Sequence, residues 1–320
     1  MRRVVGLTLT GLGAFLLVLG LLMRFYLPGQ VVRYPLNEYV VSSLTGGNMT
    51  YFSQKDLTDL GGVSMQATST VEGDVAAGTS SRAVWQEFTA LQDVSNNLPV
   101  SYTSQRSAFD RRTGVLINCC GARIGNNTKV RQSGQGFLWP FGTQKKAYQV
   151  FDTTMLRPEP FRYEGTSSVD GTTAYKFVEH VSNQKFGSQT LPGALVGIQN
   201  QASVTLPEYL TATNTFWVDP VTGAPLSEVE NQAVSLKDST GATRLVLLNG
   251  TLTSTPQSDQ NAVNIVNSAH LKIALLQDVG PLVGVVVGIA LLIIGLALLA
   301  SRRNEEELSY VDEQPENSTV

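Results

Sequence analysis

Histidine and cysteine are scarce in this chain, which contains two of each among 320 residues. Histidine is the commonest general base, and the motifs of serine hydrolases, zinc proteases and phosphate-binding loops do not occur in the long middle part of the sequence. His180 and His270 lie far apart and show no metal-ligand spacing. We therefore expect a protein that is not an enzyme, with no catalytic residue, no cofactor and no metal site.

An excess of charge of either sign is also missing, because 23 Lys and Arg stand against 26 Asp and Glu. A nucleic-acid-binding chain carries an excess of basic residues, and a disordered chain has few apolar ones, whereas 42% of this chain is hydrophobic. Several of the acids lie near the C-terminus, which leaves the middle of the chain nearly neutral. The composition predicts a folded protein without a nucleic-acid partner.

Two blocks, residues 4–23 and 279–300, lack charged side chains altogether. Each holds the roughly 20 apolar residues that a helix needs to cross about 30 Å of hydrocarbon. The alternative for the first block is a cleaved signal peptide, but Met23–Tyr26 offers no small-residue cleavage site. The alternative for the second is a buried core helix. We predict that both blocks are transmembrane helices.

The position of arginine predicts the topology of these helices. Arg2 and Arg3 precede the first block and Arg302 and Arg303 follow the second, and basic residues are enriched on the cytoplasmic side of membrane spans. We expect a plasma-membrane protein with both termini in the cytoplasm. The other predicted segments are a cytoplasmic N-terminus at 1–3, an extracytoplasmic domain at 24–278 and an acidic, disordered cytoplasmic tail at 301–320.

Short stretches rich in Val, Thr, Tyr and Phe recur between the two blocks, separated by turns in which Asp precedes Gly. Apolar residues near 260–277 recur at every third or fourth position, which is typical of an amphipathic helix. The predicted fold class is a membrane protein in which two transmembrane helices flank a single β-rich, mostly antiparallel α+β domain outside the cytoplasm. The predicted strands are 83–93, 100–109, 147–152, 173–181, 213–218, 226–236 and 243–252.

The two cysteines, Cys119 and Cys120, are neighbours in the sequence. In an oxidising compartment, neighbouring cysteines either close on each other in a strained small ring or pair with another chain. The alternative is two half-buried thiols in the turn before Gly121. A vicinal disulfide, an intermolecular disulfide and a pair of free thiols all agree with the sequence.

Glycines form stripes along both apolar blocks, and they include Gly13 in the first and Gly284 and Gly288 in the second. Small residues let helices approach closely in lipid, where van der Waals contact drives association. We expect these glycines to lie where the two helices pack on each other or where the chain dimerises.

Three aromatic side chains, Phe137, Trp139 and Phe141, lie between glycines and are followed by two lysines. They could contact an apolar ligand or the membrane interface. The alternative is that they point into the domain core, where large aromatic side chains are common. These three residues are the candidate ligand contacts.

Four stretches carry a resemblance to a known family: Ala108–Gly114, Asn118–Gly121, Trp139–Lys146 and Phe177–His180. They resemble an actinobacterial two-span membrane family of uncharacterised activity, catalogued as a domain of unknown function and labelled the porin PorA family. The two-helix layout extends the likeness over nearly the whole chain. An outer-membrane porin is a barrel without long apolar helices, so the label and the layout disagree. More weakly, the layout is similar to that of class B scavenger receptors, which implies a β-rich outer domain with a lipid tunnel.

These observations predict a cell-envelope protein whose outer domain binds or transfers an apolar or lipid ligand near the membrane. The second alternative is a scaffold that docks other envelope proteins, and the third is a porin-like, pore-forming protein. The expected partners are membrane lipids together with an envelope lipid or other envelope proteins. The sequence predicts no particular oligomer.

Overall fold

The computed structural model describes residues 2–311, with side chains for residues 3–300. The chain divides into two compact units. The helical unit comprises the residues up to Val32 and those from Ala269 onward, and the β unit comprises Arg33–Ser268. Both boundaries lie inside the predicted outer domain of residues 24–278.

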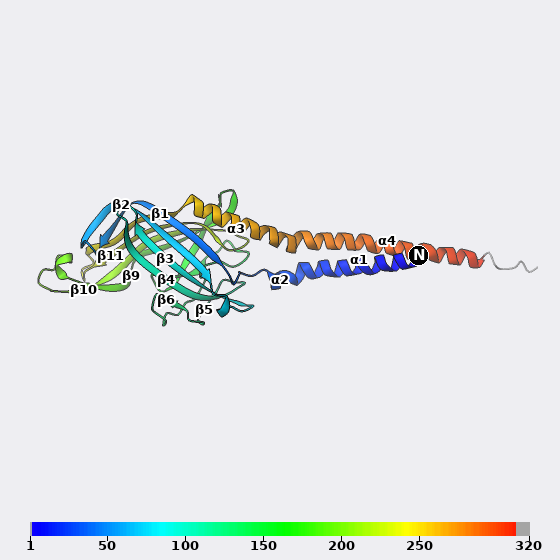
Figure 1. The fold of residues 1–320 in the computed structure, drawn as a ribbon, viewed down its shortest axis with the longest axis horizontal. Coiled ribbons are helices and arrows are strands. Elements are labelled where there is room, and N and C mark those ends of the chain that lie inside the picture. Colours follow the sequence, from blue (N-terminus) through cyan, green and yellow to red (C-terminus); the bar gives the residue numbers. More distant parts are fainter. Residues whose placement is uncertain (1, 312–320) are drawn as a thin grey trace, which may run out of the picture. The chain divides into compact units, whose positions relative to one another are not determined.

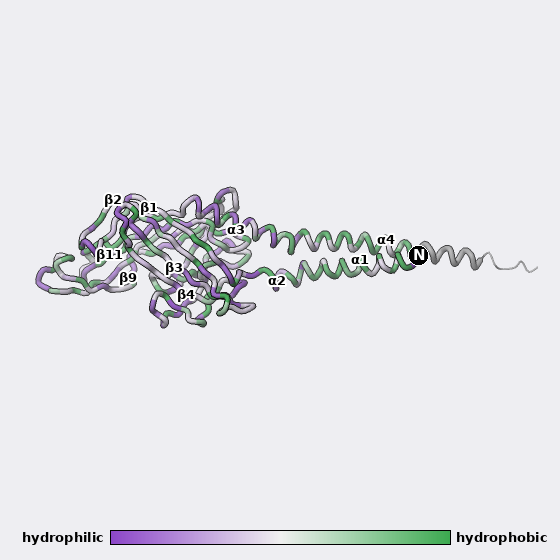
Figure 2. The backbone as a smooth tube through the Cα atoms, viewed as in Figure 1, coloured by the Kyte–Doolittle hydropathy of each residue, from purple (hydrophilic) through white to green (hydrophobic). Residues whose placement is uncertain are grey.

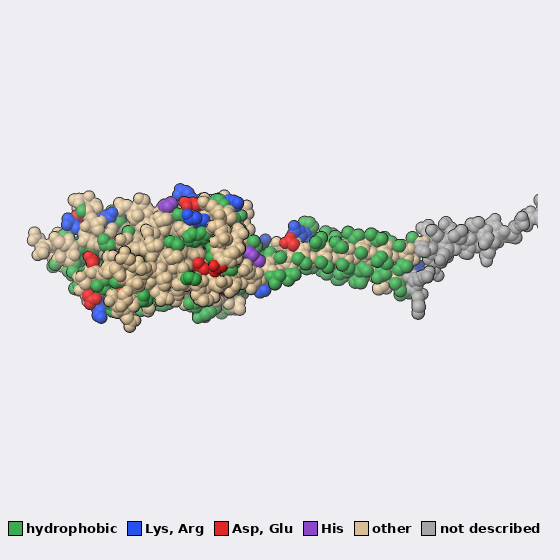
Figure 3. Space-filling model, turned by 90° about the horizontal axis from the view of Figure 1, so that it is seen from above, with side chains coloured by type: hydrophobic (Ala, Val, Ile, Leu, Met, Phe, Trp, Pro, Cys, Tyr) green, Lys and Arg blue, Asp and Glu red, His purple; other side chains and the backbone are tan. Residues whose placement is uncertain are grey.

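The helical unit contains α1 (Arg2–Phe25), the short α2 (Leu27–Val31), a π-helical turn (Leu275–Val279) and α4 (Gly280–Val311). Among the described residues, two helices are long and apolar enough to cross a membrane, Arg3–Phe25 and a window within Pro256–Ala300. Figure 2 shows both helices as mostly hydrophobic, and hydrophobic side chains cover most of the helical face seen in Figure 3. Exposed apolar surfaces of this size mark sites of contact with a membrane or with another protein.

Glycines lie at the contact between α1 and α4. A Cβ added to Gly13 would come within 2.7 Å of the Gly288 carbonyl oxygen, and one added to Gly288 within 2.8 Å of the Gly13 oxygen. A Cβ on Gly284 would lie 3.3 Å from the Gly20 Cα. The structure thus places the three predicted packing glycines in the interface, where their missing side chains let the two backbones approach.

The helices near the C-terminus are longer than the sequence patterns suggest. The predicted amphipathic helix corresponds to α3 (Pro256–Ala274), and α4 continues to Val311. The first part of the predicted disordered tail is therefore helical, while residues 312–320 lie outside the described residues. Arg, Glu and Leu, which are good helix formers, dominate this extension and account for the difference.

Twelve strands in the described part of the β unit form a single antiparallel sheet, shown in Figure 1. Its order is β5-β4-β3-β2-β1-β12-β11-β10-β9-β8-β7, with β6 paired to β4. Most connections are hairpins, and the pairing of β1 with β12 joins the two halves. The strands are β1 (Tyr39–Ser53), β2 (Thr58–Gly73), β3 (Arg82–Asp93), β4 (Leu98–Asp110), β5 (Leu116–Ile117), β6 (Arg123–Ile124), β7 (Tyr148–Asp152), β8 (Arg157–Val169), β9 (Thr172–Leu191), β10 (Val204–Val218), β11 (Pro225–Lys237) and β12 (Thr243–Ser254).

The Asp-to-Gly patterns form turns, as predicted. The Asp219 carboxylate accepts hydrogen bonds from the Thr222 backbone N–H at 2.7 Å and hydroxyl at 2.6 Å, and Gly223 N–H donates to the Asp219 carbonyl at 2.9 Å. Gly223 has a φ of 75°, and a Cβ there would overlap the Trp139 carbonyl oxygen. Only glycine fits this turn, because the conformation is left-handed and another segment lies against it.

The two edges of the sheet meet at Gln135. Leu116, in the edge strand β5, donates its N–H to the Gly134 carbonyl at 2.9 Å, while Gln135 N–H donates to the Gln149 carbonyl in β7 at 2.7 Å. Phe151 N–H in turn donates to the Gln135 carbonyl at 2.8 Å. Because β5 and β7 are the terminal strands of the sheet order, this segment joins opposite edges of a curled sheet. The β unit is a half-barrel with an interior.

The start of α3 packs on the half-barrel. Val263 and Val266 are buried against Val169, Ala174 and Leu226. Apolar residues one helical turn apart lie on one face, so this contact explains the amphipathic pattern that the sequence shows.

Candidate functional site on the inner face of the half-barrel

The inner face of the half-barrel changes from apolar to acidic and back to apolar along its strands. Glu228, Glu230, Gln232, Val234 and Leu236 occupy successive alternate positions of β11. Phe216, the cross-strand partner of Glu228, lies in an aromatic cluster, and Leu236 lies in a second apolar cluster. Side chains alternate between the two faces of a strand. The two glutamates therefore lie on the inner face, between two apolar layers.

Two further glutamates lie on the same face. Glu179 on β9 pairs with Asn214 on β10, and Asn214 pairs with Glu230 on β11, so these three side chains form a row across adjacent strands. Glu87 contributes a fourth carboxyl from β3. We call Glu87, Glu179, Glu228 and Glu230 the acidic belt.

The curl of the sheet brings Glu87 opposite Glu230. Their strands, β3 and β11, are separated by four strand-to-strand steps in the sheet order, which is about 19 Å in a flat sheet. Screening removes most of a charge interaction over such a distance, yet the Glu230 carboxylate contributes to raising the pKa of Glu87. The two side chains thus face each other across the interior.

Burial and mutual repulsion hold protons on the acidic belt. Burial, together with the charge of Glu230, raises the pKa of Glu87 from 4.5 to about 7. Burial, together with the charge of Asp152, raises the pKa of Glu179 to about 7 as well. Glu228 and Glu230 hydrogen-bond to each other, and burial raises the pKa of both. Two carboxyl groups that share a hydrogen bond share a proton, so this pair carries less than its full charge at neutral pH.

Neutral polar side chains support the acidic belt. The Asn214 amide donates to Glu179 Oε2 at 2.7 Å, and the Gln232 amide donates to Glu230 Oε2 at 3.3 Å. The Ser69 hydroxyl bonds the Glu87 carboxyl. The charged neighbours that dominate the pKa values of Glu87, Glu179 and Glu228 are other carboxyl groups. Such a surface attracts positive charge.

The acidic belt is not a metal centre by geometry. Within the described residues no three His, Cys, Asp or Glu side chains are placed so that they could hold a metal ion together. Glu87, Glu228 and Glu230 are nevertheless half-buried rather than fully buried, so water-sized molecules reach them. The arrangement can hold protons, attract cations and accept hydrogen bonds.

The aromatic residues that the sequence singles out lie in the core of the half-barrel. Trp139 is 1% exposed and packs on Phe161, Phe177 and Phe216 with ring centroids 5.5–6.0 Å apart. Trp139 is therefore not part of an exposed lip, which agrees with the core alternative for this tryptophan. Its role as a ligand contact stays a prediction.

Phe137 and Phe141 are partly buried in the neighbouring apolar cluster. Phe141 stacks on Tyr34 at 4.4 Å, and the Tyr34 hydroxyl donates hydrogen bonds to the carbonyls of Trp139 and Thr222. Burial, followed by the charge of Asp219, raises the pKa of Tyr34, so its hydroxyl stays protonated and available as a donor. Tyr34 thus fixes the aromatic segment to the start of the β unit.

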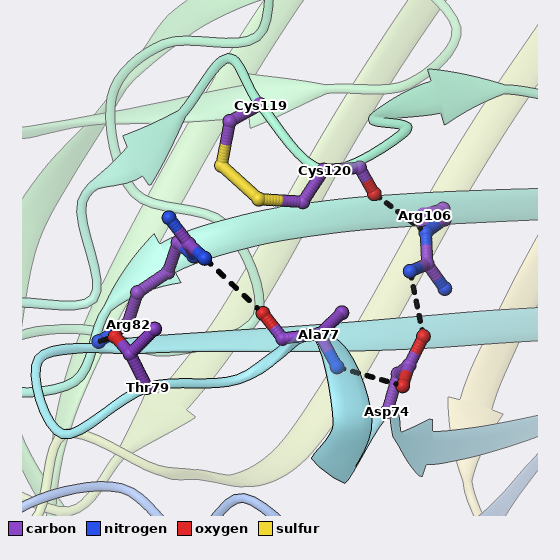
Figure 4. Close-up of a disulfide and its surroundings, with 7 residues drawn as sticks. All are labelled: Asp74, Ala77, Thr79, Arg82, Arg106, Cys119 and Cys120. Carbon is purple, nitrogen blue, oxygen red and sulfur yellow. Dashed lines mark hydrogen bonds and ion pairs between the residues drawn. A yellow bond between two sulfur atoms is a disulfide. The ribbon is translucent and has the colours of Figure 1, made fainter.

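Cys119 and Cys120 form a vicinal disulfide in the loop between β5 and β6, shown in Figure 4. Arg106 donates from Nε to the Cys120 carbonyl at 3.0 Å, and its Nη2 pairs with Asp74 at 2.7 Å. Arg106 alternates along β4 with Gln105, the cross-strand partner of Glu87. The disulfide therefore lies on the outer side of the sheet, away from the acidic belt.

The acidic belt is not among the sites predicted from the sequence. A signal existed in β11, where Glu228 and Glu230 occupy alternate positions in a stretch that ends in Val234 and Leu236. Alternate carboxylates are ordinarily a solvated strand face, and only the curl of the sheet turns this face inward.

A curled antiparallel β-sheet domain with an acidic interior, together with two helices apolar enough to cross a membrane, defines a membrane-associated protein of the cell envelope. The family model named Porin PorA matches residues 5–297. The chain therefore belongs to the Porin PorA family, which confirms the resemblance in the sequence. It is also 39% identical over 49 residues to a protein named Porin PorA in Corynebacterium resistens, a match that covers 15% of this chain and 12% of that protein.

Proposed function

We propose that the chain is a membrane-anchored, porin-like protein that takes small polar solutes into the interior of its half-barrel. The acidic belt carries this proposal, because the half-buried residues Glu87, Glu228 and Glu230 on an inner face provide a polar environment for solutes. The protein is a binding and passage protein rather than an enzyme. Its family membership supports the third of the sequence-based alternatives more than lipid binding.

In this proposal the segments 4–23 and 279–300 cross the plasma membrane, both termini lie in the cytoplasm, and the β unit lies outside. The paired arginines at the two ends and the exposed apolar side chains of α1 and α4 support this topology. The two helices carry no charged side chain in these segments, so they are poorly suited to line a water-filled pore. The polar part of the route therefore lies in the β unit.

The interior suits polar solutes better than alkyl chains. Burying an ionisable carboxyl beside hydrocarbon is costly unless it is paired, and Glu87, Glu228 and Glu230 together place three of them on one face. The aromatic side chains that were predicted to contact a lipid pack within the apolar clusters of the β unit instead. Lipid binding at Phe137, Trp139 and Phe141 stays a prediction that this geometry does not favour.

Solute passage can be tested in liposomes that contain the full chain. We expect release of small polar solutes that is blocked by Gln232→Trp, because this side chain lies at the level of the acidic belt. Asn231→Trp is the matched control, since Asn231 directly precedes Gln232 in β11 and is exposed on the outer face. Absence of release from the unmodified protein, or equal release from both variants, would overturn the proposal.

A further inference from the structure

The row formed by Glu179, Asn214 and Glu230 contains hydrogen-bond acceptors that the protein does not use. Glu179 is 1% exposed, and its Oε1 has no hydrogen-bond partner among the described residues. Asn214 Oδ1 is likewise buried and without a partner, because its amide nitrogen is directed to Glu179 Oε2. Buried acceptors without donors are rare and costly. These two acceptors lie on adjacent strands, and a ligand that brings hydrogen-bond donors would satisfy them.

We propose that this row binds an ammonium group, with Glu179 Oε1 and Asn214 Oδ1 accepting its N–H donors and Glu230 contributing negative charge. The ligand class is a small primary or secondary amine in its protonated form. This inference rests on the proposed function, because the amine has to reach the interior of the half-barrel.

An ammonium group matches the row in both charge and hydrogen bonding. Both free atoms are acceptors, so a ligand has to bring donors, and the neighbouring carboxyl groups favour a positive one. Hydrogen bonds between charged groups are about twice as strong as neutral ones. A divalent metal ion fits less well, since no three candidate ligands in the described chain converge.

The groups that face Glu179 come from four strands, β7, β8, β10 and β11. Asp152 of β7, Glu159 of β8 and Glu230 of β11 all act to raise its pKa, and the Asn214 amide acts to lower it. Glu159 is itself paired with Arg157 at 2.5 Å. An ammonium group at Oε1 would favour the ionised carboxylate, so binding should release protons near neutral pH.

Calorimetric titration of the full chain in lipid nanodiscs tests this inference. The probes are n-butylammonium, tetramethylammonium and sodium, each as its chloride in a fixed background of potassium chloride at pH 8. We expect saturable binding of n-butylammonium and about tenfold weaker binding of tetramethylammonium, which has the charge but no N–H donor. At pH 7, the heat should depend on the buffer, because protons are released.

Two substitutions locate the site. Glu179→Gln keeps the size of the side chain and should weaken n-butylammonium binding about tenfold, whereas Glu164→Gln, on an exposed carboxylate, should leave it unchanged. Glu230→Gln provides a second test in case the first variant fails to fold, and it should also weaken binding.

Equal binding of the three cations, or binding that Glu179→Gln and Glu230→Gln leave intact, would overturn the inference. If amine binding is absent while Gln232→Trp still blocks solute release, the ammonium site is wrong and the proposed function stands. If release also fails to respond to that substitution, the proposed function fails with it.

Discussion

The helical unit and the β unit differ in which side chains they place in their interiors. In the helical unit α1 and α4 approach through glycines, and large apolar side chains such as Phe15 and Ile293 point outward, with 62% and 63% of their surfaces exposed. In the β unit large side chains point inward, and carboxyl groups lie among them. The first arrangement suits lipid, where close backbone contact drives association, and the second suits water. The acidic belt therefore belongs to the β unit, while α1 and α4 are apolar enough to cross a membrane.

Trp139→Ala should produce the largest loss of stability, because it removes the side chain around which the aromatic layer of the β unit is built. Truncating a buried tryptophan costs about 3–5 kcal/mol. Chemical denaturation followed by near-ultraviolet circular dichroism measures the change. Phe88→Ala is the control, since Phe88 is 51% exposed, and it should cost much less. Equal losses would contradict the assignment of Trp139 to the core.

The acidic belt should make the β unit less stable as the pH rises. The pKa values of Glu87 and Glu179 are about 7 in the folded chain against 4.5 ordinarily. Their contribution to stability is thus complete below about pH 4.5 and is lost as the pH rises through about 7. Over this pH range, each carboxyl lowers the free energy of unfolding by an amount on the order of 1–3 kcal/mol.

Denaturation between pH 5 and pH 8 measures the slope, and Glu87→Gln should flatten it because glutamine does not ionise. Glu164→Gln changes an exposed carboxylate and should leave the slope as it is. Stability that stays level or rises over this range in the unmodified protein would mean that the carboxyl groups are not buried together.

Gly288→Leu should have a smaller and more local effect. The added side chain would meet the backbone of α1 at Gly13 and push the two helices apart, which costs roughly 1–3 kcal/mol as for other overpacked contacts. Hydrogen exchange should accelerate in α1 and α4 and stay unchanged in the β unit. Gly11→Leu is the matched control, because nothing lies within 4 Å of a Cβ at Gly11. Similar exchange in both variants would rule out a contact through Gly288.

Local patterns predicted much of this fold. The seven predicted strands correspond to β3, β4, β7, β9, β10, β11 and β12, with one residue of the range 147–152 lying outside β7, and the Asp-to-Gly turns form. Five strands, β1, β2, β5, β6 and β8, were not predicted. Gly46 and Gly47 interrupt β1, Gly61 and Gly62 interrupt β2, β8 contains two prolines, and β5 and β6 have only two residues each. Glycine and proline are disfavoured within strands, and here neighbouring strands on both sides compensate.

The acidic belt could not be predicted in the same way. Which face of a strand points inward depends on the curl of the whole sheet and on its closure at Gln135, and both are long-range features. Glu87 and Glu230 are distant in sequence, so no local pattern relates them. The residues of the aromatic segment, in contrast, are close together in the sequence and were readily found. Local composition does not distinguish a core segment from a ligand contact, so their role could not be predicted.

The most direct test of the account is the reactivity of a cysteine placed in the acidic belt. In Gln232→Cys the thiol would lie beside Glu230, and its rate of modification by cationic and anionic methanethiosulfonate reagents can be compared in the full chain. We predict that the cationic reagent reacts about tenfold faster, and that this preference shrinks when Glu228 and Glu230 are both changed to Gln. Failure of either reagent to reach the thiol, or equal rates for the two, would contradict a water-accessible, acidic interior.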